Sequence, residues 1–202
     1  MKRFGLTPLL VLAAIATAML VAARYTAYFP GDLELARFIQ AWVPAGGWAR
    51  AVTRAAYAPW IYGVLIVSAI AALRVAGWRA AAAMVLTFFA LMYVEQGMKE
   101  YIARPRPSAA AMAPGAPVSY SMPSGWALLF GSTVGLLGVL AWRHARGATR
   151  WAYVLGCVAV LSAGLKARVV LGAHWPSDVI AGYLIAITIG LALSELLVAL
   201  KK

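Results

Sequence analysis

The chain has 202 residues, of which 64% are hydrophobic and only 12% are charged. Because soluble domains carry about 25% charged residues, this composition excludes an ordinary soluble protein and indicates an integral membrane protein. The net charge of +12 would suggest a nucleic-acid partner in a soluble protein. Here the basic residues flank apolar runs in short clusters, as they do where membrane helices are anchored and oriented. We therefore expect a membrane environment and no nucleic acid.

The first apolar run, residues 5–23, follows Lys2 and Arg3 and resembles a secretory signal. A run of 19 residues would be about 28 Å long as a helix. That length exceeds the hydrophobic region of a signal peptide and suits a bilayer span. We therefore predict an uncleaved signal anchor.

Further apolar runs, bounded by charge, Pro or Gly, recur along the chain and are long enough to cross a bilayer. The six predicted spans are residues 5–23, 58–74, 78–98, 125–142, 151–171 and 176–199. The predicted fold is all-α: a polytopic membrane protein with six transmembrane helices, in which residues 1–202 form one membrane-embedded domain.

An even number of spans places both termini on one side of the membrane. Nine basic residues flank the spans on that side and nine on the other. Five of the latter lie in or beside stretches that are assigned below to phosphate binding; without them the count is nine against four. Basic loops favour the cytoplasm, so the termini are predicted to be cytoplasmic, in a bacterial inner membrane, with the site on the outer, periplasmic face.

Residues 30–57 are of mixed polarity and connect the first two spans. Asp32 is a plausible N-cap, and Leu35, Phe38, Ile39 and Trp42 recur at helical spacing on one face. This pattern predicts an amphipathic helix on the outer surface of the membrane. A packed loop is the alternative.

The third span ends in a cluster of charged residues. Lys99 and Arg106 are seven positions apart, so they would share a face if the helix continued. Pro105 and Pro107 are expected to stop it there. Glu95 precedes Lys99 by four residues, which suits an ion pair within the membrane; a role in handling protons is the alternative.

The fourth span begins after an irregular stretch, residues 108–122, with the sequence Pro123-Ser124-Gly125-Trp126. Pro123 cannot lie inside a helix, and Ser124 is a good N-cap. The free backbone N–H groups at the start of the new helix form a ready site for an anion. A plain helix cap without a ligand is the alternative.

The connection between the last two spans holds Arg168, His174 and Asp178 where two apolar segments meet water. A guanidinium can hold phosphate, an imidazole can attack or transfer a proton, and a carboxylate can orient that imidazole. Asp178 falls in the first turn of the last span, where an acid complements the helix dipole. Without a ligand, Arg168 would simply extend toward lipid headgroups.

Under the six-span topology these three stretches emerge on the same face, and there they resemble the signature of the type 2 phosphatidic acid phosphatase superfamily, membrane lipid phosphatases. That signature is Lys with six residues before Arg-Pro, then Pro-Ser-Gly-His, then Ser-Arg with five residues before His and three more before Asp. The matching segments here are Lys99 to Arg106-Pro107, Pro123 to Trp126, and Ala167-Arg168 to Asp178.

The resemblance implies a role for each matching residue. Three cations, Lys99, Arg106 and Arg168, would clamp the phosphate of a lipid phosphate or diphosphate, and Ser124 and the Gly125 N–H would add hydrogen bonds. His174 would be the nucleophile that forms a phosphohistidine, with Asp178 fixing its tautomer. No metal or cofactor is implied.

Two positions depart from the signature. Ala167 replaces a serine, and Trp126 replaces the histidine that protonates the leaving group in the family. An indole N–H donates a hydrogen bond but is not a useful acid, and a general acid typically contributes about 10²- to 10⁴-fold. Its loss should matter least when the leaving group is a phosphate, with a pKa of about 6, rather than an alcohol.

The sequence therefore favours cleavage or transfer of the terminal phosphate of a lipid diphosphate, such as a polyprenyl diphosphate. One alternative is a non-hydrolytic relative that binds or moves a phosphorylated lipid. Another is a lipid monophosphatase that Trp126 has inactivated. A channel or transporter without a phosphate site fits the hydropathy alone, and no feature indicates the lipid head, its tail or the oligomeric state.

Overall fold

The computed structural model describes residues 5–107 and 119–200, and in these residues every regular element is helical. The helices are α1 (Leu6–Tyr25), α2 (Asp32–Trp42), α3 (Gly47–Arg54), α4 (Trp60–Ala76), α5 (Trp78–Ile102), α6 (Gly125–Phe130), the π-helix η2 (Gly131–Gly135), α7 (Leu136–His144), α8 (Gly147–Val170) and α9 (Pro176–Ala199). The predicted all-α fold is confirmed.

Each predicted span corresponds to a helix or to a continuous run of helices. Among the described residues, five are long and apolar enough to cross a bilayer: α1, α5, the run from α6 to α7, α8 and α9. The sixth, α4, is equally apolar in character but has 17 residues, about 26 Å at 1.5 Å per residue. The protein is therefore a polytopic membrane protein.

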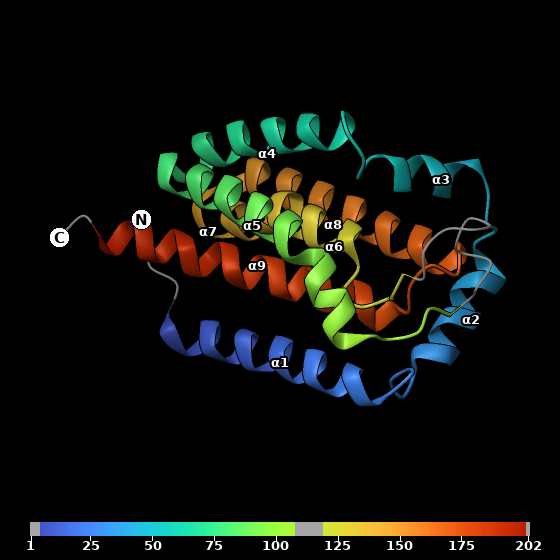
Figure 1. Ribbon diagram of the computed structural model, residues 1–202. Helices are drawn as coiled ribbons and strands as arrows, with labels where there is room; N and C mark the ends of the chain where they lie inside the picture. The colour runs from blue at the N-terminus through green and yellow to red at the C-terminus, as the bar shows by residue number, and fades with distance from the viewer. Residues whose placement is uncertain (1–4, 108–118, 201–202) are drawn as a thin grey trace.

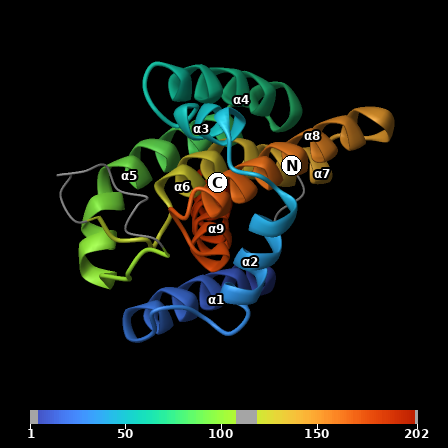
Figure 2. The same ribbon diagram turned by 90° about the vertical axis from the view of Figure 1, so that its right-hand side faces the viewer.

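The continuous helix Gly125–His144, formed by α6, η2 and α7, lies at the centre of the bundle. In its most apolar stretch 78% of the residues are buried, against 28% in α5 and 11% in α1. It contacts α4, α5, α8 and α9, which surround it in Figures 1 and 2. A helix that is apolar all round and enclosed by others fits this central position.

Glycine allows α9 to approach the central helix closely. A Cβ added at Gly182 would lie 2.7 Å from the Cβ of Ala127 and 3.2 Å from the carbonyl oxygen of Ser124. Small residues at helix interfaces let backbones approach in this way. The start of α9 is thereby held against the start of α6.

The first residues of α1 and the last residues of α9 lie at one end of the bundle, and α2 and α3 lie at the other (Figure 1). This arrangement agrees with an even number of spans. The end of α5, the start of α6 and the connection from α8 to α9 lie at the same end as α2 and α3. The three signature segments are therefore brought to one end of the molecule.

The amphipathic segment between the first two spans forms two helices, α2 and α3, instead of one. On α2, Leu35, Phe38 and Trp42 are exposed, whereas Ile39 is buried against α8. The exposed apolar side chains suit a helix at the membrane interface. The predicted N-cap was wrong: Gly31 occupies that position, and Asp32 is the first helical residue.

The helix α5 ends before the two prolines. Its last residue is Ile102, and Ala103 follows in the left-handed region with φ 55°. Arg106 therefore lies in the connection beyond the helix, so it does not share a helix face with Lys99. Tertiary contacts, described next, bring the two cations together.

Candidate active site

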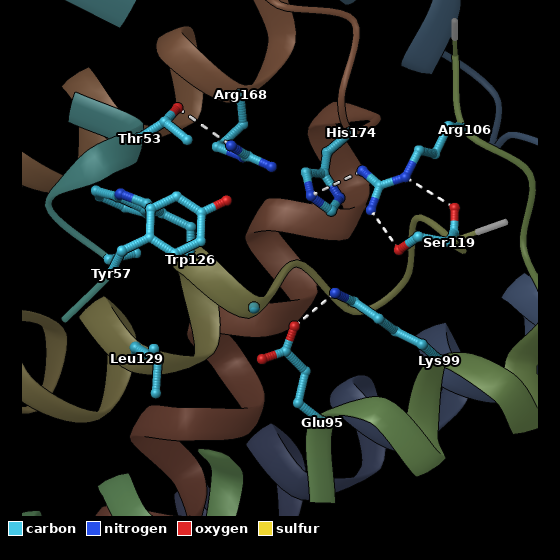
Figure 3. A pocket seen from close by; sticks show the side chains of 12 residues that line it. Thr53, Tyr57, Glu95, Lys99, Arg106, Ser119, Trp126, Leu129, Arg168 and His174 are labelled. Atoms are coloured by element: carbon cyan, nitrogen blue, oxygen red, sulfur yellow. Dashed lines mark hydrogen bonds and ion pairs between the residues drawn. The ribbon is translucent and has the colours of Figure 1, made fainter. Parts of the chain in front are cut away.

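A cavity of about 280 Å³ lies where the signature segments meet. Its wall is formed by α3 and the connection to α4, by α5, α6 and α8, by the segments before residue 108 and after residue 118, and by the connection from α8 to α9. The lining residues are Thr53, Ala56, Tyr57, Glu95, Lys99, Arg106, Ser119, Gly125, Trp126, Leu129, Arg168 and His174. Figure 3 shows the polar side chains pointing into it.

Three cations line the cavity, as the resemblance implied: Lys99 from α5, Arg106 from the connection beyond it, and Arg168 from α8. Arg168 donates from Nη1 to Oγ1 of Thr53 at 3.1 Å, and its buried Nε has no hydrogen-bond partner among the described residues. A buried donor without a partner is costly. The guanidinium thus keeps one buried donor that the described residues do not satisfy.

Arg106 is fixed by its neighbours on both sides. Its Nε and Nη2 donate to the carbonyl and the hydroxyl of Ser119, at 2.8 and 2.9 Å. Its Nη1 donates to the carbonyl oxygen of Ala173 at 2.6 Å and lies 3.4 Å from Nε2 of His174. The protein's own contacts therefore hold the guanidinium beside the imidazole.

The tautomer of His174 follows from one hydrogen bond. Nδ1 lies 2.6 Å from the carbonyl oxygen of Ser121, and since a carbonyl only accepts, Nδ1 carries the proton and Nε2 the lone pair. The pKa of His174 lies well below its ordinary value of 6.5 because of burial and then the charges of Arg168, Arg106 and Lys99. The imidazole is therefore neutral at pH 7, and its unprotonated nitrogen, Nε2, faces Arg106.

Asp178 does not make the hydrogen bond that was expected to fix this tautomer. Its Oδ2 lies 3.8 Å from Nδ1 of His174 and accepts the backbone N–H of Trp175 at 2.8 Å. Its Oδ1 pairs with Arg104. The carboxylate lies in the first turn of α9, as predicted. It is near the imidazole but is not one of the residues that line the cavity.

Arg104 forms a buried ionic network that the sequence did not reveal. Besides Asp178, it pairs with Oδ2 of Asp32 at 2.9 Å and donates to Oγ of Ser177 at 2.9 Å. Asp32 in turn accepts from the backbone N–H and the hydroxyl of Ser177, at 2.9 and 2.6 Å. Charges inside a membrane protein are costly unless paired, so this network joins α2 firmly to the start of α9.

The start of α6 matches the predicted helix cap. The hydroxyl of Ser124 accepts from the backbone N–H of Ala127 at 3.4 Å, and Ser124 is fully buried behind the cavity wall. Gly125 lines the cavity, and a Cβ added there would lie 2.0 Å from Oε1 of Glu95. A side chain at this position would require the carboxylate of Glu95 to move.

Trp126 is part of the packed wall. Its Nε1 donates to the carbonyl oxygen of Val52 at 2.8 Å, and its ring stacks on Phe130 with the centroids 3.8 Å apart. A Cβ added at Gly164 would lie 2.0 Å from the indole. Because its one N–H is already donated, the indole has no proton donor to offer inside the cavity.

Four site residues were not identified from the sequence: Thr53, Tyr57, Ser119 and Ser121. Thr53 bonds to Arg168, and Tyr57 lines the cavity. Ser119 bonds to Arg106, and the carbonyl group of Ser121 orients His174. None belongs to a recognisable motif, and Ser121 acts through its backbone, which carries no sequence signal. In the part of the chain that the structure describes, no three His, Cys, Asp or Glu side chains cluster to hold a metal ion.

Comparison with solved structures shows a similar fold in the crystal structure of a transmembrane PAP2-type phosphatidylglycerolphosphate phosphatase from Bacillus subtilis. The TM-score is 0.66 over 92% of this chain and 93% of that one, at 15% sequence identity. No curated protein matches the sequence. The sequence model of the PAP2 superfamily matches residues 78–201, well over half of the chain. The resemblance seen in the sequence is thus confirmed, and the chain belongs to the PAP2 superfamily.

Proposed function

We propose that this protein is a membrane lipid phosphatase or phosphotransferase that acts on the terminal phosphate of a lipid diphosphate, such as a polyprenyl diphosphate. The observation that carries the proposal is the composition of the cavity: three cations surround a histidine whose Nε2 bears a lone pair. Phosphoryl transfer depends mainly on such positioned positive charge.

In the first step, Nε2 of His174 attacks the terminal phosphorus, and the bond to the bridging oxygen breaks. The electron pair leaves with the lipid monophosphate, and the phosphoryl group remains on the imidazole as a phosphohistidine. Lys99, Arg106 and Arg168 neutralise the oxygens of the transferred group. Water, or an acceptor hydroxyl, then takes the phosphoryl group and frees the imidazole.

The preference for a diphosphate follows from Trp126. A lipid alcohol is about as weak an acid as water, with a pKa of about 15.7, so it needs a proton as it leaves. A phosphate leaving group, with a pKa of about 6, does not. Because the N–H of Trp126 is donated to Val52, the family's usual proton donor is replaced by a group that cannot serve.

The decisive experiment measures phosphate release by purified protein from a lipid diphosphate and the matched lipid monophosphate. We expect faster release from the diphosphate and no release by His174→Ala. Phosphatidylglycerolphosphate belongs among the monophosphates, since the similar structure from Bacillus subtilis is a phosphatase for that lipid. Faster release from the monophosphates would contradict the diphosphate assignment.

A second candidate function is binding or movement of a phosphorylated lipid without hydrolysis. The position of Trp126 favours it, because its N–H is donated to Val52 and the family's usual proton donor is missing, whereas the three cations that could bind a phosphate remain. In that case lipid binding would survive in His174→Ala, and neither protein would release phosphate. Trp126→His that gained monophosphatase activity would instead indicate a monophosphatase inactivated by the tryptophan.

A further inference from the structure

The second half of the proposed reaction needs a proton acceptor. Water that attacks the phosphohistidine must lose a proton as its oxygen bonds to phosphorus. In the family signature a histidine stands at position 126, but Trp126 has no basic nitrogen, since an indole N–H only donates. This inference rests on the proposed function and concerns which group replaces that histidine.

Glu95 is the carboxylate in the cavity wall. It projects from α5 toward the start of α6, where its three carboxyl atoms lie 2.0 to 2.5 Å from the position of an added Cβ on Gly125. That places it against the backbone of the residue just before Trp126. Its side chain is 24% exposed, so water reaches it.

The ion pair with Lys99 orients the carboxylate of Glu95. Nζ of Lys99 lies 2.5 Å from Oε1 of Glu95, and both side chains line the cavity with His174 (Figure 3). The two oxygens of a carboxylate offer about four acceptor positions, so the bond to Lys99 leaves positions that a water molecule can use. Lys99 also links the carboxylate to the phosphate that it is expected to bind.

The other groups are unsuited to this role. Lys99, Arg106 and Arg168 are cations, His174 carries the phosphoryl group, and the phenol of Tyr57 is a much weaker proton acceptor than a carboxylate. Asp178 is fully buried outside the cavity wall, with its oxygens bonded to Arg104 and to the N–H of Trp175. Among the described lining residues, Glu95 is the one carboxylate.

We propose that Glu95 is the general base that activates water for hydrolysis of phospho-His174. A proton moves from water to the carboxylate as the water oxygen bonds to phosphorus. The P–Nε2 bond breaks, and its electron pair returns to the imidazole. The neutral carboxyl group then gives its proton to the departing phosphate or to solvent, which restores the resting enzyme.

The test is rapid-quench kinetics of Glu95→Gln with a lipid diphosphate labelled in its terminal phosphate. We expect a burst of about one lipid monophosphate per protein, followed by phosphate release that is about 10²- to 10⁴-fold slower than in the wild type. The label should remain bound to Glu95→Gln, whereas His174→Ala should not become labelled. The burst itself shows that the variant is folded.

Two variants serve as controls. Glu100→Gln changes a carboxylate on the same helix that pairs with Gln96 at 2.7 Å outside the cavity wall, and it should keep wild-type kinetics. Lys99→Met removes the partner of Glu95 and should slow the burst itself, because Lys99 is expected to bind the phosphate in the first step.

The outcomes separate this role from others. If Glu95→Gln shows no burst and retains no label, Glu95 acts in the first step or only positions Lys99, and the general-base role is wrong. Unchanged phosphate release in Glu95→Gln would also overturn it while leaving the proposed function intact. A wild-type protein that releases no phosphate, or whose release persists in His174→Ala, would overturn the proposed function and this role with it.

Discussion

Arg168 connects the cavity to α3 through Thr53 and keeps a buried Nε without a hydrogen-bond partner in the described residues. A planar guanidinium can bind phosphate through two parallel N–H bonds, which an ammonium group cannot reproduce. We therefore expect Arg168→Lys to lower kcat/KM about 10- to 150-fold, the equivalent of one charge-assisted hydrogen bond of about 1.5–3 kcal/mol. Lys166→Met, at an exposed position on the same helix, should stay close to the wild type.

The pKa of His174 should determine how activity depends on pH. Burial and three neighbouring cations hold its pKa well below 6.5, so the neutral imidazole persists as the pH falls through 6.5. The acidic limb of kcat/KM should therefore lie below 6.5, where protonation removes the nucleophile. A limb at or above that pH would contradict the expectation.

Arg106→Gln provides the matched comparison for this limb. It removes one of the charges that lower the pKa of His174, so the acidic limb should move upward, toward 6.5. The ionisation of the substrate is the same for both proteins, so a difference between them belongs to the enzyme. An unchanged limb would mean that Arg106 does not act electrostatically on His174.

The residues that form the cavity differ in how far the sequence could identify them. The spacing of Lys99, Arg106, Arg168 and His174 identified them in advance, and the structure places all four in one cavity wall. The carbonyl of Ser121, which orients His174, could not be identified, because every residue has a carbonyl group. Thr53 was equally invisible, since it reaches Arg168 across 115 positions of sequence.

Between elements, Arg104 pairs with one acid on α2, Asp32, and with one on α9, Asp178. Replacing it with Met would leave Asp32 and Asp178 as buried charges without their cation, and breaking a buried ion pair in this way costs about 3–5 kcal/mol. Arg104→Met should therefore lower the unfolding free energy in detergent by that amount. Arg37→Met, at an exposed position on α2, should have little effect; equal losses would argue against the network.

The contact between α6 and α9 depends on Gly182. In Gly182→Ala the new Cβ would lie 2.7 Å from that of Ala127, so the helices must separate. Overpacking of this kind typically costs about 1–3 kcal/mol. We also expect lower activity, because α9 starts beside His174 and α6 starts with Gly125.

Gly156→Ala is the control for this substitution. Gly156 lies on α8, and a Cβ added there would have no neighbouring atom within 4 Å. Both the stability and the activity should therefore be retained or slightly improved. Thermal unfolding and phosphate release, measured on the two variants together, distinguish the close contact from a general effect of replacing glycine. Similar behaviour of both variants would show that the contact is not critical.

Local signals predicted helix boundaries better than they predicted contacts between helices. Ser124 caps α6 as expected, because capping depends only on neighbouring residues. Asp32 was assigned as a cap by the same reasoning, yet its carboxylate is drawn into the network around Arg104. Arg104 itself looked like one more basic residue at the membrane surface, and only the folded arrangement shows that it is buried.

At the scale of the whole molecule, the six apolar segments were predictable because the length needed to cross a bilayer is a property of the local sequence. How they pack was not, since every span is apolar on several faces. The central position of Gly125–His144 became visible only through its burial in the structure.

The orientation in the membrane remains a prediction. It can be tested by labelling two positions, because α2 and the connection between α7 and α8 lie at opposite ends of the bundle (Figure 1). The basic residues outside the phosphate-binding stretches number nine on the side of the termini and four on the other, which favours cytoplasmic termini. In a Cys157→Ala background, a membrane-impermeant maleimide should label Ala41→Cys on α2 in intact cells. Thr149→Cys, at the start of α8, should be labelled only after permeabilisation. Since the cavity opens at the end of α2 and α3, this pattern would place phosphate release outside the cytoplasm, and the reverse pattern would place it inside.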